Sequence, residues 1–193
     1  IRASAPAGRP GFAGFMELRT SPREAREIRV VARQWQWIFQ YPNGHTDDVL
    51  HVPADEPVRL VMRSDDVIHG FYVPDFRLQM DVVPGRYTTV WFRAPQAGEH
   101  DLYCAQYCGT RHSDMFTKVV VHPPGEYEKW LATAGSEYKN MPPAEAGKLL
   151  YQRRGCSQCH SIDGTAGTGP SFKGIFGHKV FFGPASGHAA KAG

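Results

Sequence analysis

Four potential metal ligands fall within twelve residues near the middle of the chain: Cys104, Cys108, His112 and Met115. Cysteine and methionine are soft ligands that favour copper and zinc, whereas imidazole also suits iron and nickel. A structural zinc site takes four strong ligands and has no use for a thioether, so the methionine indicates copper, where a weak axial sulfur is familiar. A mononuclear site needs one thiolate, and two thiolates bridging two copper ions would explain the second. A disulfide is the alternative for this pair, since an oxidising compartment would permit it.

A second chemical motif is Cys156-Ser157-Gln158-Cys159-His160, the Cys-x-x-Cys-His signature of c-type haem attachment. Two thiols at this spacing reach the two vinyl groups of one haem, and the following histidine becomes the proximal iron ligand. A redox dithiol would instead need a βαβ context, and nothing like it surrounds this segment. Residues 145–153 favour a helix before the motif, entered through Pro142-Pro143.

The residues around the first motif have the pattern of β-strands. Apolar residues alternate through residues 28–32 and repeat on the other parity through residues 35–41, which a β-bulge would explain. Further strand-like runs cover residues 58–62, 87–92 and 116–121. Short strands separated by Pro/Gly turns predict a β-sandwich or barrel, ending at His122-Pro123-Pro124-Gly125, with a short amphipathic helix expected over residues 126–131.

The first motif resembles the loop of the dinuclear copper centre, CuA, in subunit II of haem-copper cytochrome c oxidases. The family pattern Cys-x-Glu-x-Cys-Gly-x-x-His-x-x-Met matches at Cys104, Cys108, Gly109, His112 and Met115. Residues 33–37, 67–71, 73–76 and 81–86 match as well, so that the resemblance covers roughly residues 28–122. It implies a mainly β, cupredoxin-like Greek-key sandwich. The implied ligands of two copper ions are His69, Cys104, the Gln106 carbonyl, Cys108, His112 and Met115.

Two positions in this resemblance carry further expectations. Gln106 replaces the usual glutamate between the cysteines; its backbone carbonyl serves copper equally well, but an amide would bind the family's interfacial magnesium less tightly. Trp35 stands where the family receives electrons from soluble cytochrome c, with a role as a core aromatic as the alternative.

Residues 167–178 resemble the Gly-Pro stretch of class I cytochromes c, an all-α fold. The resemblance implies that the Pro170 carbonyl accepts the ring proton of His160 and orients it toward iron. The family's sixth iron ligand is a later methionine, but every methionine here precedes Cys156. His178 and His188 are candidate substitutes, and a partial, truncated cytochrome domain is the simpler expectation.

These motifs divide the chain into residues 1–27, 28–122, 123–140 and 141–193. The first is expected to be an irregular segment leading out of the membrane after absent N-terminal helices, since no stretch of eighteen apolar residues and no signal peptide are present. The third is a linker. Lys+Arg against Asp+Glu is 9 to 11 in residues 28–122 and 6 to 2 in residues 141–193, giving about −2 and +4. The imbalance suits docking between the domains, although a solvated charged face is the default interpretation.

No basic stripe is present, which argues against nucleic-acid binding. The other histidines beside turn or charged residues are expected to be solvated: His45, His51, His100 and His122.

The whole chain resembles subunit II of a caa-type cytochrome c oxidase. Electrons would pass from cytochrome c or another donor to haem c on Cys156 and Cys159, then to copper and to subunit I, where oxygen reduction and proton pumping occur. The chain itself would only transfer electrons, on the periplasmic or outer face of the cell membrane beside the other membrane subunits. A CuA-containing nitric-oxide reductase would use the same ligands. Nitrous-oxide reductase would need a large propeller, and a structural quinol-oxidase subunit would lack the copper ligands retained here.

Overall fold

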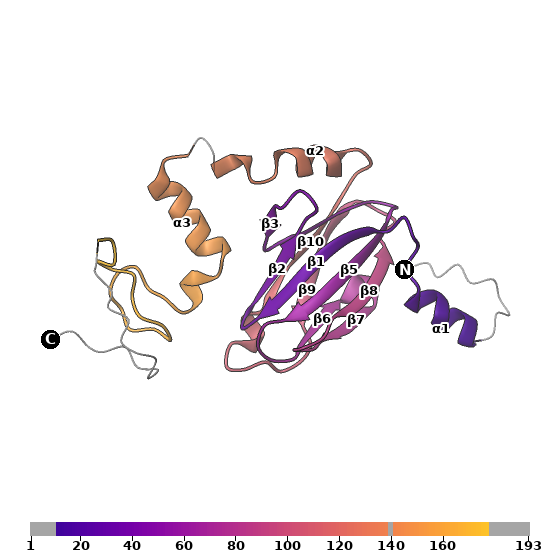
Figure 1. The fold of residues 1–193 in the computed structure, drawn as a ribbon, viewed down its shortest axis with the longest axis horizontal. Coiled ribbons are helices and arrows are strands. Elements are labelled where there is room, and N and C mark those ends of the chain that lie inside the picture. Colours follow the sequence, from indigo (N-terminus) through magenta and orange to yellow (C-terminus); the bar gives the residue numbers. More distant parts are fainter. Residues whose placement is uncertain (1–10, 139–140, 178–193) are drawn as a thin grey trace. The chain divides into compact units, whose positions relative to one another are not determined.

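The computed structural model describes residues 11–138 and 141–177, and the chain divides into two compact units, residues 1–154 and 155–193. The described strands belong to the first unit (Figure 1). Their bounds are β1 Arg26–Arg33, β2 Gln36–Gln40, β3 Thr46–Asp47, β4 Leu50–Pro53, β5 Pro57–Ser64, β6 His69–Val73, β7 Leu78–Val82, β8 Thr88–Arg93, β9 Gly98–Cys104 and β10 Phe116–His122.

The strands form two five-stranded sheets, which confirms the predicted mainly β fold. One sheet has the order β3-β2-β1-β5-β8 and the other the order β4-β10-β9-β6-β7. Most neighbours are antiparallel, but β1 pairs in parallel with β5, and β10 with β4. The strands that carry the copper motif, β6, β9 and β10, are antiparallel neighbours, so the start of β6, the end of β9 and the start of β10 meet at one end of the second sheet.

Apolar side chains of both sheets make the core. Trp37 of β2 meets Phe71 of β6 edge to face, with ring centroids 5.4 Å apart, and both are fully or almost fully buried. Strand β1 lies between β2 and β5. Its consecutive residues Val30 and Val31 point to opposite faces of the sheet, and both are buried. A strand buried on both faces holds its sheet firmly, because every side chain contributes apolar burial.

The alternation of apolar residues changes parity after residue 32 because the chain turns there in a β-hairpin, and the expected bulge is wrong. Strands β1 and β2 pair antiparallel, with Arg33 opposite Gln36, so Gln34 and Trp35 form the connection. A two-residue connection reverses the chain direction and restarts the alternation, which explains why the aromatic residues change parity.

The expectation that residues 1–27 are irregular is wrong for the described part. Helix α1 spans Gly11–Arg19, and the Glu17 carbonyl accepts a hydrogen bond from Trp91 Nε1 of β8 at 3.2 Å. The segment contains the good helix formers Ala13, Met16 and Leu18. Their preference for the helix outweighs the unfavourable contribution of Gly11 and Gly14 within the same segment.

Two helices and four short 3₁₀ turns complete the described chain. Helix α2 covers Glu126–Thr133 and α3 covers Pro143–Arg153, which confirms both expected helices. The 3₁₀ turns are η1 Pro74–Phe76, η2 His112–Asp114, η3 Ser136–Tyr138 and η4 Cys156–Gln158. The first compact unit ends at residue 154 and therefore includes α3. The sequence instead predicts that α3 belongs to a haem domain that starts at residue 141. None of the helices in the described part of the chain has the length and apolarity needed to cross a membrane.

The solvated-surface interpretation of the histidines is wrong for His45, His51 and His122. The parallel pairing of β4 and β10 brings their rings together, with His51 Nδ1 2.8 Å from His122 Nε2. Trp130 of α2 stacks on His51 with centroids 4.0 Å apart. Burial lowers the pKa of His51 to about 4 and also lowers that of His122. Alternation along both strands places these rings on one outer face, which α2 then covers.

His45 and His100 also have specific partners. The His45 side chain retains only 10% of its exposure and lies 3.2 Å from the Asp47 carboxylate. His100 Nδ1 lies 2.7 Å from Asp75. His100 therefore has the Asp75 carboxylate as a direct partner.

Candidate metal centre

The predicted copper ligands come from the ends of neighbouring strands. β6 begins at His69, β9 ends at Cys104, and Phe71 lies opposite Cys104 in the sheet. The loop from 105 to 115 closes on itself because the Cys104 N–H donates to the Met115 carbonyl at 3.0 Å. All five side-chain candidates are thereby held at one end of the second sheet.

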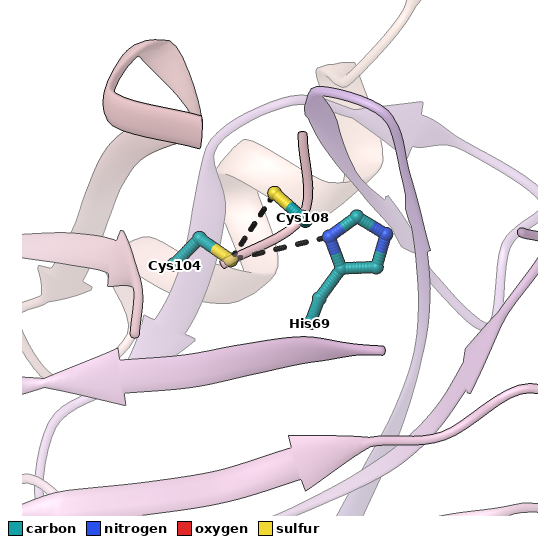
Figure 2. A group of neighbouring side chains, drawn as sticks. All are labelled: His69, Cys104 and Cys108. Atoms are coloured by element: carbon teal, nitrogen blue, oxygen red, sulfur yellow. Dashed lines mark hydrogen bonds between the residues drawn. The ribbon is translucent and has the colours of Figure 1, made fainter. Parts of the chain in front are cut away.

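The two thiols form the middle of the cluster. Cys104 Sγ and Cys108 Sγ are 3.7 Å apart, and Cys104 Sγ is 3.9 Å from His69 Nδ1 (Figure 2). Both cysteines are free, and the sulfur separation is far above the 2.05 Å of a disulfide bond. One ligand atom from each of the three residues lies within 4.8 Å of the others.

The remaining candidates extend this cluster on both sides. Cys108 Sγ is 3.5 Å from His112 Nδ1 and 3.9 Å from Met115 Sδ. The backbone carbonyl of Gln106 lies 3.2 Å from Cys104 Sγ, and Gln106 is an exposed residue. The structure thus brings together all six predicted ligand groups, with an imidazole Nδ1 beside each thiol.

Four of the side-chain ligands are almost completely buried, whereas His112 is half-buried. His69 is 0% exposed, Met115 2%, Cys108 3% and Cys104 8%. Buried polar side chains need partners, and His69 has both Cys104 of the cluster and Asp66 beside it. The soft sulfurs, the imidazoles and the single carbonyl fit copper.

The electrostatics of the thiol pair favour a cation between them. Burial opposes ionisation of Cys104, but its contact with His69 and the backbone hydrogen bonds around it lower its pKa to about 6. Burial and the neighbouring Cys104 charge raise the pKa of Cys108 to about 12. The first proton leaves easily and the second does not, because two adjacent thiolates repel. A bound metal cation reverses that penalty and makes both thiolates stable.

Gly70 allows the ligand loop to approach β6. A Cβ added at Gly70 would lie 2.8 Å from the Gln106 nitrogen and 3.0 Å from the Ala105 carbonyl carbon. The Gly70 carbonyl also accepts the Ala105 N–H at 2.8 Å. Any side chain at Gly70 would push the ligand loop away from His69.

Trp35 lies next to the cluster but is only 9% exposed. Its indole Nε1 donates to the Cys108 carbonyl at 3.3 Å. The side chain therefore combines core packing with a direct hydrogen bond to the backbone of a ligand residue.

Sequence reasoning missed two residues beside the ligands. Asp66 Oδ1 lies 2.8 Å from His69 Nε2, and Gln34 Nε2 donates to the Cys108 carbonyl at 2.8 Å. The available signal was a carboxylate three residues before a predicted histidine ligand. Gln34 gave no local signal, because its contact joins residues 74 positions apart.

The second unit holds the Cys-x-x-Cys-His motif on the turn η4. Cys156 and Cys159 are free and half-buried. His160 Nδ1 lies 2.8 Å from the Pro170 carbonyl, and Phe172 stacks on the His160 ring with centroids 4.4 Å apart. The structure brings His160 and Pro170 together as the sequence implies, while His178 and His188 lie outside the described residues.

Gly169 is the close-packed point of this second site. A Cβ there would lie 2.6 Å from Cε1 of His160. The contact of His160 Nδ1 with the Pro170 carbonyl leaves Nε2 on the opposite side of the ring. Haem ligation would need Nε2 in that orientation. The motif and its surroundings therefore fit covalent haem attachment, which remains a prediction.

Comparison with known proteins found relatives of the domain that holds the copper-ligand cluster. Residues 43–122 match the family described as "Cytochrome C oxidase subunit II, periplasmic domain". The alternative cytochrome c oxidase subunit 2 of Bradyrhizobium diazoefficiens is 34% identical over 63% of this chain and 56% of its own length. Cytochrome c oxidase subunit 2 of Alkalihalophilus pseudofirmus is 31% identical over 81% of this chain and 47% of its own length. The chain thus spans about half the length of these two relatives.

A solved structure shares the sandwich. The crystal structure of the periplasmic domain of subunit II of cytochrome oxidase from Bradyrhizobium japonicum superimposes with a TM-score of 0.57 at 26% identity, covering 61% of this chain and 99% of that one. The family match covers strands β3 to β10 and contains the whole ligand cluster. The β-sandwich of this chain is therefore cupredoxin-like, and residues 43–122 of it are similar to the periplasmic domain of cytochrome c oxidase subunit II.

Proposed function

We propose that this chain is the electron-transfer subunit of a terminal respiratory oxidase. It would pass electrons from a donor through haem c to a dinuclear copper centre and on to subunit I for oxygen reduction. One observation carries the proposal: two free, buried cysteines lie 3.7 Å apart, each beside an imidazole Nδ1. A disulfide or a single-metal thiolate site does not need this doubled arrangement.

Each residue of the cluster has a separate task in this proposal. Cys104 and Cys108 would bridge both copper ions, and His69 and His112 would each hold one. Met115 and the Gln106 carbonyl would be the weaker ligands. A copper pair held by these residues would supply one-electron redox chemistry. The rigid sandwich keeps the ligands in place in both redox states, which keeps the reorganisation needed for electron transfer small.

Haem c on Cys156, Cys159 and His160 would supply the electron. The hydrogen bond geometry of His160 and Pro170 supports this part of the proposal. The match to the Alkalihalophilus pseudofirmus protein supports it too. That match covers 81% of this chain, a larger share than the residues up to the end of the sandwich at residue 122 could supply. The similarity to an oxidase subunit 2 therefore continues beyond the sandwich.

The partners in this proposal are subunit I and other membrane subunits, with cytochrome c or another donor supplying electrons. The chain would lie on the periplasmic or outer face of the cell membrane. Trp35 would be an entry or relay point, since its indole contacts the Cys108 carbonyl directly. The exposed Gln106 side chain would bind an interfacial magnesium less tightly than a glutamate.

Steady-state turnover of the intact membrane complex tests this function. We expect oxygen consumption with reduced cytochrome c to be lost in Cys104→Ser and retained in Thr110→Ala, a change at an exposed residue of the same loop. Nitric oxide offered in place of oxygen distinguishes an oxidase from a nitric-oxide reductase. Full oxygen consumption in Cys104→Ser would contradict the proposed role of the copper pair.

A further inference from the structure

Asp66 connects the two halves of the copper-ligand cluster without belonging to it. Its Oδ1 lies 2.8 Å from His69 Nε2, and its Oδ2 accepts the Gln34 N–H at 2.6 Å. Gln34 and Trp35, which form the β1–β2 connection, both donate to the Cys108 carbonyl. A continuous hydrogen-bonded path thus runs from the imidazole beside Cys104 to the backbone of Cys108.

The contact with Asp66 sets the orientation of the His69 ring. A carboxylate accepts a hydrogen bond, so Nε2 of His69 carries the proton and Nδ1 keeps its lone pair. Nδ1 is the atom that faces Cys104 Sγ. The ring therefore presents its metal-binding nitrogen to the thiol cluster before any metal arrives.

Asp66 is itself held in place. Its Oδ1 also accepts the Val67 N–H at 2.7 Å and lies 3.3 Å from Ser64 Oγ, while its side chain keeps 29% of its exposure. A carboxylate fixed by several donors can orient a neighbour, whereas a mobile one cannot.

We propose that Asp66 is a positioning residue of the copper centre. It orients His69 for metal binding and fastens the Gln34–Trp35 connection that holds the Cys108 carbonyl. This inference rests on the proposed function, because it assumes that His69 and Cys108 bind copper.

The test uses purified chain with copper restored and a matched pair of substitutions. Asp66→Ala removes the hydrogen bond to His69, and Asp66→Asn keeps an acceptor but loses the charge. Asp65→Ala and Asp65→Asn are the controls: Asp65 is one residue away, carries the same charge and pairs with Arg63. Chelator competition gives copper affinity, and proton magnetic resonance of the copper-loaded protein gives the exchange rate of the His69 Nε2 proton with solvent.

We expect Asp66→Ala to weaken copper binding about 10- to 100-fold, the usual effect of losing such a partner, and to speed exchange of the His69 ring proton. Asp66→Asn should weaken binding less than Asp66→Ala and shift the reduction potential more than Asp65→Asn does. The Asp65 variants should keep the wild-type affinity and exchange rate.

The outcomes separate this inference from the function on which it rests. If the wild-type chain binds no copper pair, the proposed function fails before Asp66 is tested. If wild type binds the pair and both Asp66 variants match their Asp65 counterparts, the positioning role is wrong. Thermal melting of the metal-free proteins shows whether Asp66→Ala folds, and if it does not, the comparison of Asp66→Asn with Asp65→Asn decides.

Discussion

The two potential redox sites of this chain differ in how deeply their residues are buried in a protein core. At the copper end, His69, Cys104, Cys108 and Met115 are buried within a two-sheet core. Around the Cys-x-x-Cys-His motif, no residue in the described range 155–177 is buried. The apolar side chains there stay open to solvent: Ile162 is 59%, Ile175 54% and Phe176 fully exposed.

The difference shows how cofactor size relates to folding. Small ions fit between side chains that strands already hold, so the sandwich can form its site from its own core. A haem is a broad apolar plate, and the segment around His160 exposes apolar surface that such a plate would cover. We therefore expect copper binding to adjust a folded domain and haem attachment to complete one, as coupled binding and folding does in small metal domains.

Blocking haem attachment should have the largest effect. In Cys156→Ser/Cys159→Ser, residues 155–177 should lose nearly all protection from hydrogen exchange, because no buried core remains to support them. The strands should keep their protection, since their core does not involve the motif. Peptide-level hydrogen exchange measures both regions in one sample, with Ser157→Ala as the control. Equal protection of residues 155–177 in the serine and control variants would show that the second unit folds without haem.

Removing one bridging thiol should abolish the copper pair but spare the sandwich. A serine hydroxyl is too hard to bridge two coppers, so Cys108→Ser should bind one copper or none where wild type binds two. The metal-free melting temperature should change by only a few degrees, because serine occupies nearly the same volume. Metal analysis and calorimetry check the two parts. Retention of both coppers would refute the bridging assignment.

The half-buried pair of His51 and His122 should give the sandwich its own pH dependence. Burial lowers the folded-state pKa of His51 to about 4, below its ordinary 6.5. The unfolded chain therefore binds a proton first as pH falls, and stability present above about pH 6.5 should decline toward pH 4. We expect a loss on the order of 1–2 kcal/mol after allowing for solvent screening.

Comparison with a variant isolates this contribution. Burial and the neighbouring Asp47 raise the pKa of Asp48 to about 6, and this group acts in the opposite direction over part of the same range. Denaturant unfolding of wild type and His51→Phe at several pH values cancels the Asp48 effect. The stability difference between the two proteins should narrow or change sign below pH 6, and a constant difference would exclude the histidine as the cause.

The axial thioether should have the smallest effect of the four. Met115→Leu should keep both coppers, because a weak ligand tunes the metal more than it holds it. The reduction potential should shift on the order of 60 mV, which corresponds to tenfold in a one-electron equilibrium. Redox titration of the two proteins measures it, and loss of all copper in Met115→Leu would reverse this order of ligand importance.

Local spacing predicted the parts of the molecule that lie close together in the sequence. The ligand loop from Cys104 to Met115 could be recognised because one segment carries four ligands. Helices α2 and α3 followed from propensity and turn signals. His69 needed a family resemblance, since nothing in its own segment connects it to Cys104.

Features that depend on strand register could not be found in this way. The His51–His122 contact exists because β4 and β10 pair in parallel, and Asp66 meets Gln34 across 32 residues. The β1–β2 hairpin resembled a bulge because a turn and a bulge change the alternation equally. These features became visible only once the sheet order was known.

Electron spin resonance of the purified, copper-loaded chain tests the central claim most directly. Two equivalent coppers sharing one unpaired electron across Cys104 and Cys108 should give a seven-line hyperfine pattern, with two coppers per chain by metal analysis. A four-line pattern with one copper per chain would contradict the dinuclear centre.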